Sequence, residues 1–139
     1  MDWIECLPHR PPMRLVEEIV ELTHGRSATG QRTAHAQDFY FQGHFPGQPV
    51  VPAIILVELL AQTGGIAVAA PAPGQAAAEP RQLRVAALGP FKFPAAAGPG
   101  TTLQARARIT GHMGGLFKIE GEVTADDVLV AVGTVTLAG

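Results

Sequence analysis

Cysteine, charged residues and aromatic residues are all scarce in this chain of 139 residues. The single cysteine, Cys6, excludes an internal disulfide and is typical of a reducing compartment, so we expect a cytoplasmic protein. The 10 lysine and arginine residues against 12 aspartate and glutamate residues exclude the strongly basic surface that binds nucleic acid. The histidines show no metal-ligand spacing and the glycines no phosphate-loop pattern, so we expect neither a metal nor a cofactor.

Targeting and membrane-spanning segments are also lacking. The start, MDWIECLPHR, has no basic stretch followed by an apolar core, so no signal peptide is expected. Residues 50–70 (VVPAIILVELLAQTGGIAVAA) are long enough to span a membrane, but Glu58, Gln62 and Gly64-Gly65 argue against a span. The run instead predicts a helix that protein surrounds on nearly all sides.

The remaining pattern predicts strands before and after this helix. A curved antiparallel sheet wrapped around one long central apolar helix would bury that helix, which gives an α+β fold in a single domain of residues 1–139. The Pro/Ala/Gly-rich residues 71–80 predict a loop, and Gly114-Gly115 and Asp126-Asp127 predict turns in an antiparallel meander. The predicted strands cover residues 14–22, 25–36, 82–93 (interrupted at Gly89-Pro90), 101–113, 116–124 and 128–137, and the helix runs from Pro52 to Val68 or Ala70.

Two residues in this frame suggest acid–base chemistry. Glu58 lies in the middle of the apolar run, where an ionised carboxylate is costly unless it is paired or protonated. A carboxylic acid kept neutral by its surroundings is a proton donor. His44 lies in the loop Gly43-His44-Phe45-Pro46-Gly47, and histidine is the usual proton acceptor near neutral pH. Gln62, one helical turn after Glu58, is expected to hold the Glu58 carboxyl by a hydrogen bond.

Three blocks of residues extend this interpretation to a known family. They are Leu7-Pro8-His9-Arg10-Pro11-Pro12, then residues 39–49 (FYFQGHFPGQP) continued by Val51-Pro52, and then Glu58 followed by Ala61-Gln62. Phe91-Lys92-Phe93 and Gly98-Pro99-Gly100 add a weaker match. Together these blocks resemble the bacterial (3R)-3-hydroxyacyl-[acyl-carrier-protein] dehydratases of the hotdog fold.

The resemblance implies a reaction and an assembly. His44 would remove a proton from the α-carbon of a 3-hydroxyacyl thioester, and Glu58 would protonate the departing hydroxyl. The backbone N–H of Ala53 would polarise the thioester carbonyl, and Phe45, Gly47 and Gln62 would also contact substrate. The resemblance implies that His44 and Glu58 of one site come from different subunits of a homodimer or larger homo-oligomer, or of a heterodimer with a related subunit. The acyl chain, delivered by an acyl carrier protein, would lie in an apolar tunnel along the interface.

The sequence departs from the family pattern in three places. Ala53 stands where the family usually has glycine, which adds a methyl group where the thioester approaches. Leu59-Leu60 replaces a small residue followed by methionine and is expected to reshape the tunnel. Phe93-Pro94-Ala95 replaces a basic Arg-Arg-Pro segment. These departures bear on the identity of the substrate more than on the type of reaction.

Two other functions stay open from the residues. A thioesterase would use Glu58 to activate water or as a nucleophile, although it would not need a base aimed at the α-carbon. A catalytically inactive acyl-binding or scaffold subunit would keep the fold while a partner performs the chemistry, and Ala53 is the feature that favours it.

Overall fold

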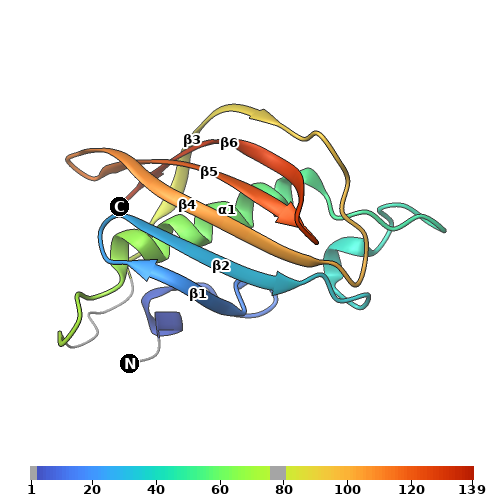
Figure 1. Ribbon diagram of the computed structural model, residues 1–139, viewed down its shortest axis with the longest axis horizontal. Coiled ribbons are helices and arrows are strands. Elements are labelled where there is room, and N and C mark those ends of the chain that lie inside the picture. Colours follow the sequence, from blue (N-terminus) through green and yellow to red (C-terminus); the bar gives the residue numbers. More distant parts are fainter. Residues whose placement is uncertain (1–2, 76–80) are drawn as a thin grey trace.

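The computed structural model describes residues 3–75 and 81–139 of the chain. One long helix and six strands dominate it (Figure 1). The end of the loop predicted for residues 71–80 lies outside the described residues. The elements are η1 (Trp3–Cys6), β1 (Glu18–Thr23), β2 (Ser27–Thr33), η2 (Phe39–Phe41), α1 (Ala53–Ala69), β3 (Arg84–Lys92), β4 (Thr102–Met113), β5 (Leu116–Ala125) and β6 (Val128–Ala138).

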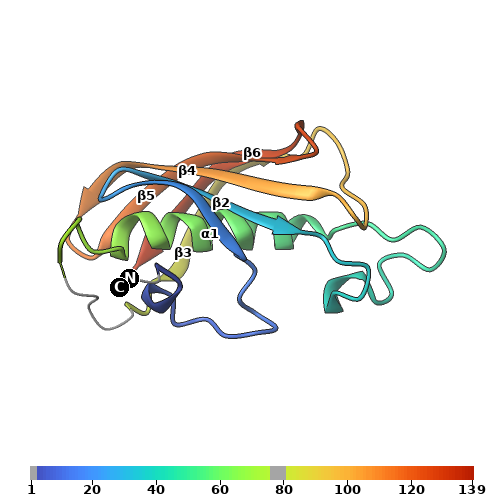
Figure 2. The same cartoon turned by 60° about the horizontal axis from the view of Figure 1, so that its bottom comes forward.

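The six strands form one antiparallel sheet in the order β1-β2-β4-β5-β6-β3. The sheet curves over one side of α1, while η1 and the segment that follows it lie on the other side (Figure 2). The predicted α+β architecture is therefore confirmed. The predicted meander holds for β4, β5 and β6, but β3 pairs with β6 and lies at the edge of the sheet, away from its neighbour in sequence.

Helix α1 follows Pro52, whose missing N–H costs nothing at a helix start. All residues from Leu59 to Ala67 are buried, as the apolar run predicts. The helix approaches the sheet closely: a Cβ atom on Gly30 of β2 would lie 2.5 Å from the Thr63 hydroxyl oxygen. Among the described residues, no helix is long and apolar enough to cross a membrane.

The hairpin turns lie where the sequence predicts them. Gly114-Gly115 connects β4 to β5, and Asp126-Asp127 connects β5 to β6. The φ angles of Asp126 and Asp127 are 46° and 68°, the left-handed region that a two-residue hairpin turn requires. Along β4, Leu103, Ala105 and Ala107 are buried while Arg106 and Arg108 are exposed, so the predicted alternation is confirmed.

Two strand predictions need correction. The first strand begins at Glu18 rather than Arg14, because the Gln62 side chain takes the backbone groups of Met13 and Leu15 that a strand would use. The predicted interruption at Gly89-Pro90 is only a shift in the pairing between β3 and β6. An edge strand tolerates proline because its N–H side can face away from the sheet.

Candidate active site

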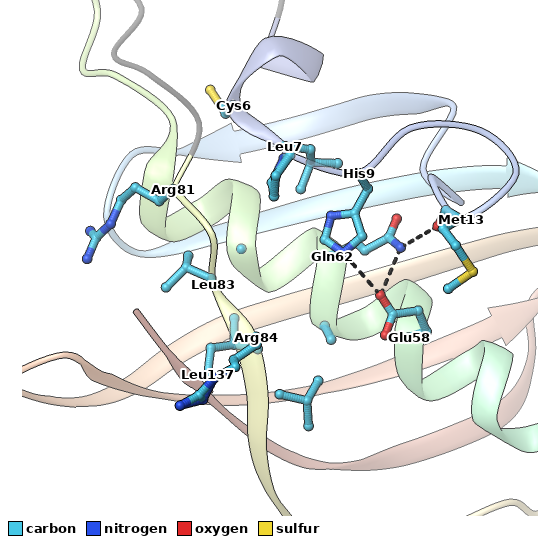
Figure 3. Close-up of a pocket in the computed structure, with 14 residues that line it drawn as sticks. Cys6, Leu7, His9, Met13, Glu58, Gln62, Arg81, Leu83, Arg84 and Leu137 are labelled. Carbon is cyan, nitrogen blue, oxygen red and sulfur yellow. Dashed lines mark hydrogen bonds and ion pairs between the residues drawn. The ribbon is translucent and has the colours of Figure 1, made fainter.

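Glu58 projects from α1 beside the segment that precedes β1 (Figure 3). Its side chain is 26% exposed, and its Oε2 accepts a hydrogen bond of 2.9 Å from Gln62 Nε2. Gln62 is itself held, since its Nε2 also donates to the Met13 carbonyl at 2.7 Å and its Oε1 accepts from the Leu15 N–H at 2.8 Å. The hydrogen bond expected from the spacing of residues 58 and 62 is therefore present, and it fixes which carboxyl oxygen faces the protein.

A second side chain, which is not among the predicted site residues, lies beside the same carboxyl. His9 Nε2 is 3.5 Å from Glu58 Oε2, and Figure 3 shows the ring next to Gln62. His9 precedes Gln62 by more than fifty residues, so no local pattern relates them. The only feature of the sequence that points to His9 is its place in the block Leu7-Pro8-His9-Arg10. This block resembles the family but does not identify a role for the histidine.

A cavity of about 310 Å³ opens next to Glu58. Ala61 and Gly65 of α1 line it. Leu7, Leu83 and Leu137 are among its apolar walls (Figure 3). The lining is mostly apolar, with polar groups that include His9, Glu58 and Gln62, and it can accept a hydrocarbon chain. Leu59 and Leu60, which were expected to reshape a tunnel, are fully buried in the core and do not line this cavity.

His44 lies elsewhere in the chain, in the loop between η2 and α1. This loop extends past the end of the sheet in both ribbon views (Figure 1, Figure 2). The ring and the carbonyl of His44 both bind Val50: the ring Nδ1 is 3.0 Å from the Val50 carbonyl, and the Val50 N–H donates to the His44 carbonyl at 2.8 Å. A carbonyl can only accept, so the ring proton lies on Nδ1 and the lone pair on Nε2 can accept a proton.

The tip of the His44 loop carries two further predicted residues. Phe45 is 56% exposed, and its ring stacks on that of His44 with 4.2 Å between centroids. The N–H of Phe45 donates to the Gln48 carbonyl, and that of Gln48 to the Phe45 carbonyl, which closes a tight turn. Gly47 lies in this turn with φ of 78°, a conformation that a residue with a side chain rarely adopts.

The base of the loop is anchored by a charged network. Arg32 donates from Nη2 and Nε to the two Asp38 oxygens at 2.7 and 3.2 Å, and the Tyr40 hydroxyl donates to Asp38 Oδ2 at 2.6 Å. Burial raises the pKa of the Asp38 carboxyl, but the hydrogen bonds from Arg32 and Tyr40 outweigh burial and bring that pKa below its usual value. Burial, followed by the hydrogen bond with Asp38, raises the pKa of Tyr40 to about 12. The start of the loop is therefore held by hydrogen bonds around the ionised Asp38 carboxylate.

Ala53 is the first residue of α1 and is exposed. The first four N–H groups of a helix have no partner inside it, so the Ala53 N–H can bind an oxyanion at the positive end of the helix dipole. The Val51 N–H donates to the Ala97 carbonyl, which ties the helix start to the segment after β3.

The predicted site residues thus fall into two groups. Glu58 and Gln62 lie at the cavity, joined by His9, while His44, Phe45, Gly47 and Ala53 lie around the loop and the helix start. His44 is not among the residues that line the cavity of Glu58. Within one chain the structure does not bring the candidate base and the candidate acid together.

Comparison with known proteins identifies the family of this chain. Residues 7–134 match the FabA-like domain. The chain belongs to the FabA-like family. Similar FabA-like proteins include two named 3-hydroxyacyl-[acyl-carrier-protein] dehydratase FabZ. The one from Chloroflexus aggregans is 37% identical over 123 residues, 88% of this chain and 83% of the relative. The one from Syntrophotalea carbinolica is 34% identical over 131 residues, 94% of this chain and 87% of the relative.

Solved structures support the same fold for this FabA-like chain. The dehydratase heterocomplex ApeI:P from Xenorhabdus doucetiae superposes with a TM-score of 0.77 at 15% identity, covering 99% of this chain and 90% of the other. The antiparallel sheet curved around one helix is the hotdog fold that the sequence predicts.

Proposed function

We propose that this protein is a 3-hydroxyacyl-[acyl-carrier-protein] dehydratase, which removes water from a 3-hydroxyacyl thioester to give the trans-2-enoyl thioester. The observation that carries the proposal is the Glu58 carboxyl, held through Oε2 by Gln62 at the mouth of an apolar cavity. A carboxyl in such a place can present its other oxygen to a hydroxyl on an acyl chain. Membership of the FabA-like family supports the same reaction.

The chemistry divides between the two candidate residues. His44 accepts the α-proton on Nε2, and the electrons of the broken C–H bond become the Cα–Cβ double bond as the Cβ–O bond breaks. Glu58 donates its proton to the departing oxygen, which leaves as water. The Ala53 N–H, at the helix start, stabilises the negative charge that grows on the thioester oxygen. Proton exchange with solvent then restores neutral His44 and protonated Glu58.

A site shared between two subunits of a homodimer would bring His44 of one chain close to Glu58 of the other. Strand β3 is an edge strand whose residues are largely exposed, including the apolar Val85 and Leu88. An exposed apolar edge pairs readily with another strand. Two-fold pairing of β3 with β3 is antiparallel, so the end that carries Lys92 in one chain lies opposite the end that carries Val85 in the other.

This pairing has a consequence for the site. Val85 lines the cavity of Glu58, whereas the segment after Lys92 leads to Ala97, whose carbonyl binds the helix start beside the His44 loop. A β3–β3 dimer therefore moves the partner's loop end towards the Glu58 cavity. This argument supports two sites per dimer, each made by both chains, with α1 near the interface.

The names of the relatives supply the proposed substrate carrier. Two proteins more than 30% identical to this chain are named for substrates on an acyl carrier protein. We extend that partner to this protein, together with a cytoplasmic location that suits its single cysteine and a single working domain of residues 1–139.

The test is dehydration of a 3-hydroxyacyl-carrier protein, followed by mass spectrometry. We expect loss of water by the wild-type protein. His44→Ala and Glu58→Gln should each lower turnover by about a hundredfold or more, because each removes a proton-transfer group. His24→Ala and Glu21→Gln, at exposed positions of β1 and the turn after it, are matched controls and should retain activity. Loss of the acyl group would indicate a thioesterase instead.

Subunit mixing tests the shared site. Dimers with one His44→Ala chain and one Glu58→Gln chain contain one intact site and one doubly altered site, so exchange should restore part of the activity. A monomer by light scattering at micromolar concentration would contradict the assembly. Absence of recovery, with exchange verified by native mass spectrometry, would show that both residues act from one chain.

Two observations favour a second assembly. The similar structure from Xenorhabdus doucetiae is a dehydratase heterocomplex, and Ala53 adds a methyl group at the helix start. Under this alternative the chain is an acyl-binding subunit of a heterodimer with a related subunit. The purified chain would then form an assembly but leave the 3-hydroxyacyl substrate unchanged.

A further inference from the structure

His9 and Gln62 approach the same oxygen of Glu58. Gln62 Nε2 is 2.9 Å from Oε2, and His9 Nε2 is 3.5 Å from it (Figure 3). Within the described part of the chain, no hydrogen bond reaches Oε1. The carboxyl is therefore divided into an oxygen that faces two protein nitrogens and an oxygen that is left for substrate.

The surroundings of His9 determine which ring nitrogen carries the proton. Nδ1 is buried and has no hydrogen-bond partner among residues 3–75 and 81–139. A proton on Nδ1 would bury an N–H without an acceptor and would turn the Nε2 lone pair towards Oε2. We therefore assign the proton to Nε2, where it points at the carboxyl. This is the reverse of His44, whose proton is on Nδ1 and whose Nε2 can act as a base.

Hydrogen bonds to the main chain hold the segment that carries His9. Arg10 Nη1 donates to the Leu7 carbonyl at 2.9 Å and to the His9 carbonyl at 2.8 Å, which closes the chain around His9. Farther along, the Gln62 bonds to Met13 and Leu15 fasten the same segment to α1. The segment from Leu7 to Leu15 is thus fixed on both sides of the histidine, and its position relative to Glu58 follows from those bonds.

We propose that His9 is a positioning residue for the dehydration reaction: its Nε2–H supports Oε2 while Glu58 gives up its proton from Oε1. This role rests on the proposed function. As the proton leaves Oε1, negative charge grows on the carboxyl and strengthens every donor aimed at it. Contacts that are long in a protein without substrate commonly shorten in the reacting complex. His9 itself neither gains nor loses a proton in the step.

A contact that strengthens only as charge develops affects kcat more than KM. We therefore expect His9→Phe, which keeps a flat ring without a donor, to lower kcat roughly tenfold while KM changes by less than about twofold. His9→Gln, whose Nε2 reaches about as far as that of histidine, should recover most of the loss. In a Glu58→Gln background, His9→Phe should have no further effect, because His9 acts through Glu58.

A matched control comes from the other histidine–glutamate pair. His35 Nε2 is 2.8 Å from Glu17 Oε2, away from the cavity. His35→Phe removes a comparable contact and should leave both constants near the wild-type values. Should His9→Phe fail to fold, His9→Met gives the same comparison, since it fills the space without a donor.

The outcomes separate this role from the proposed function. An inactive wild-type protein would overturn both. An active wild type with unchanged kcat in His9→Phe would overturn only the role of His9. Equal losses in His9→Phe and His9→Gln, or a loss as large as that of Glu58→Gln, would also overturn it, because the first indicates a structural role and the second a proton-transfer role.

Discussion

Replacing Gln62 by leucine should reduce both stability and turnover, because this side chain joins α1 to the segment before β1. Gln62 is 1% exposed and makes three hydrogen bonds. The Leu15 N–H is buried, so its lost partner costs roughly 1–3 kcal/mol. The Met13 carbonyl and the Glu58 carboxyl are partly exposed and can rehydrate, so each adds only about 0.5–1 kcal/mol. The expected loss is about 3 kcal/mol.

The free energy of unfolding from urea titrations at one fixed chain concentration measures this loss. With a slope of about 2 kcal/mol per molar urea, the midpoint of Gln62→Leu should fall by about 1.5 M. Gln104→Leu is the matched control, because Gln104 makes its hydrogen bonds on the outer face of the sheet. A loss for Gln62→Leu below about 1 kcal/mol, or equal to that of Gln104→Leu, would refute the bridging role of Gln62.

Two further predictions concern the His44 loop and the helix start. Tyr40 is the only tyrosine in the chain, so its ultraviolet absorbance should show ionisation near pH 12 rather than at the ordinary value of 10.0, and Asp38→Asn should move that midpoint towards 10.0. Because the folded-state pKa of Tyr40 is raised, the stabilising contribution of Tyr40 is complete below pH 10 and is lost as pH rises through about 12. An absorbance midpoint near pH 10 in the folded protein would contradict the buried network. For the helix start, Ala53→Gly should preserve or raise kcat/KM and Ala53→Val should lower it, since both keep the N–H and change only the bulk beside the thioester. Equal values for all three proteins would mean that the thioester does not pass position 53.

The elements that depend on local chemistry could be predicted from the sequence. Pro52 and the apolar run fix where α1 begins and what surrounds it, and Gly114-Gly115 and Asp126-Asp127 determine the turns of β4, β5 and β6. The place of β3 could not be predicted in the same way. Its choice of β6 as a partner depends on the crossing path of residues 93–101, and alternation within a strand carries no information about which neighbour it pairs with.

The sequence predicts His44 and Glu58 as candidate residues but does not predict how they are arranged in space. His44 and Glu58 stand out because each is chemically unusual in its own segment. His9 does not stand out, because its relation to Glu58 is created by the Gln62 bonds to Met13 and Leu15, which join segments 47 and 49 residues apart in sequence. The same long-range bonds explain why β1 starts later than its alternation suggests.

The three polar residues of α1 are satisfied in three different ways. The Thr63 hydroxyl donates to the Leu59 carbonyl of its own helix at 2.8 Å. With its hydroxyl proton paired in this way, the Thr63 side chain packs against Gly30 of the sheet. Gln62 uses both ends of its amide on the segment before β1 and still has an N–H for Glu58. Of the three, only Glu58 has a side-chain oxygen, Oε1, that accepts no hydrogen bond from the described residues, and Glu58 lines the cavity. Burying polar groups in an apolar helix is costly unless each is paired, and Thr63 and Gln62 meet this requirement. The Glu58 carboxyl is instead partly exposed and has its free oxygen at the cavity, an arrangement that supports the proposed role of Glu58 as the acid.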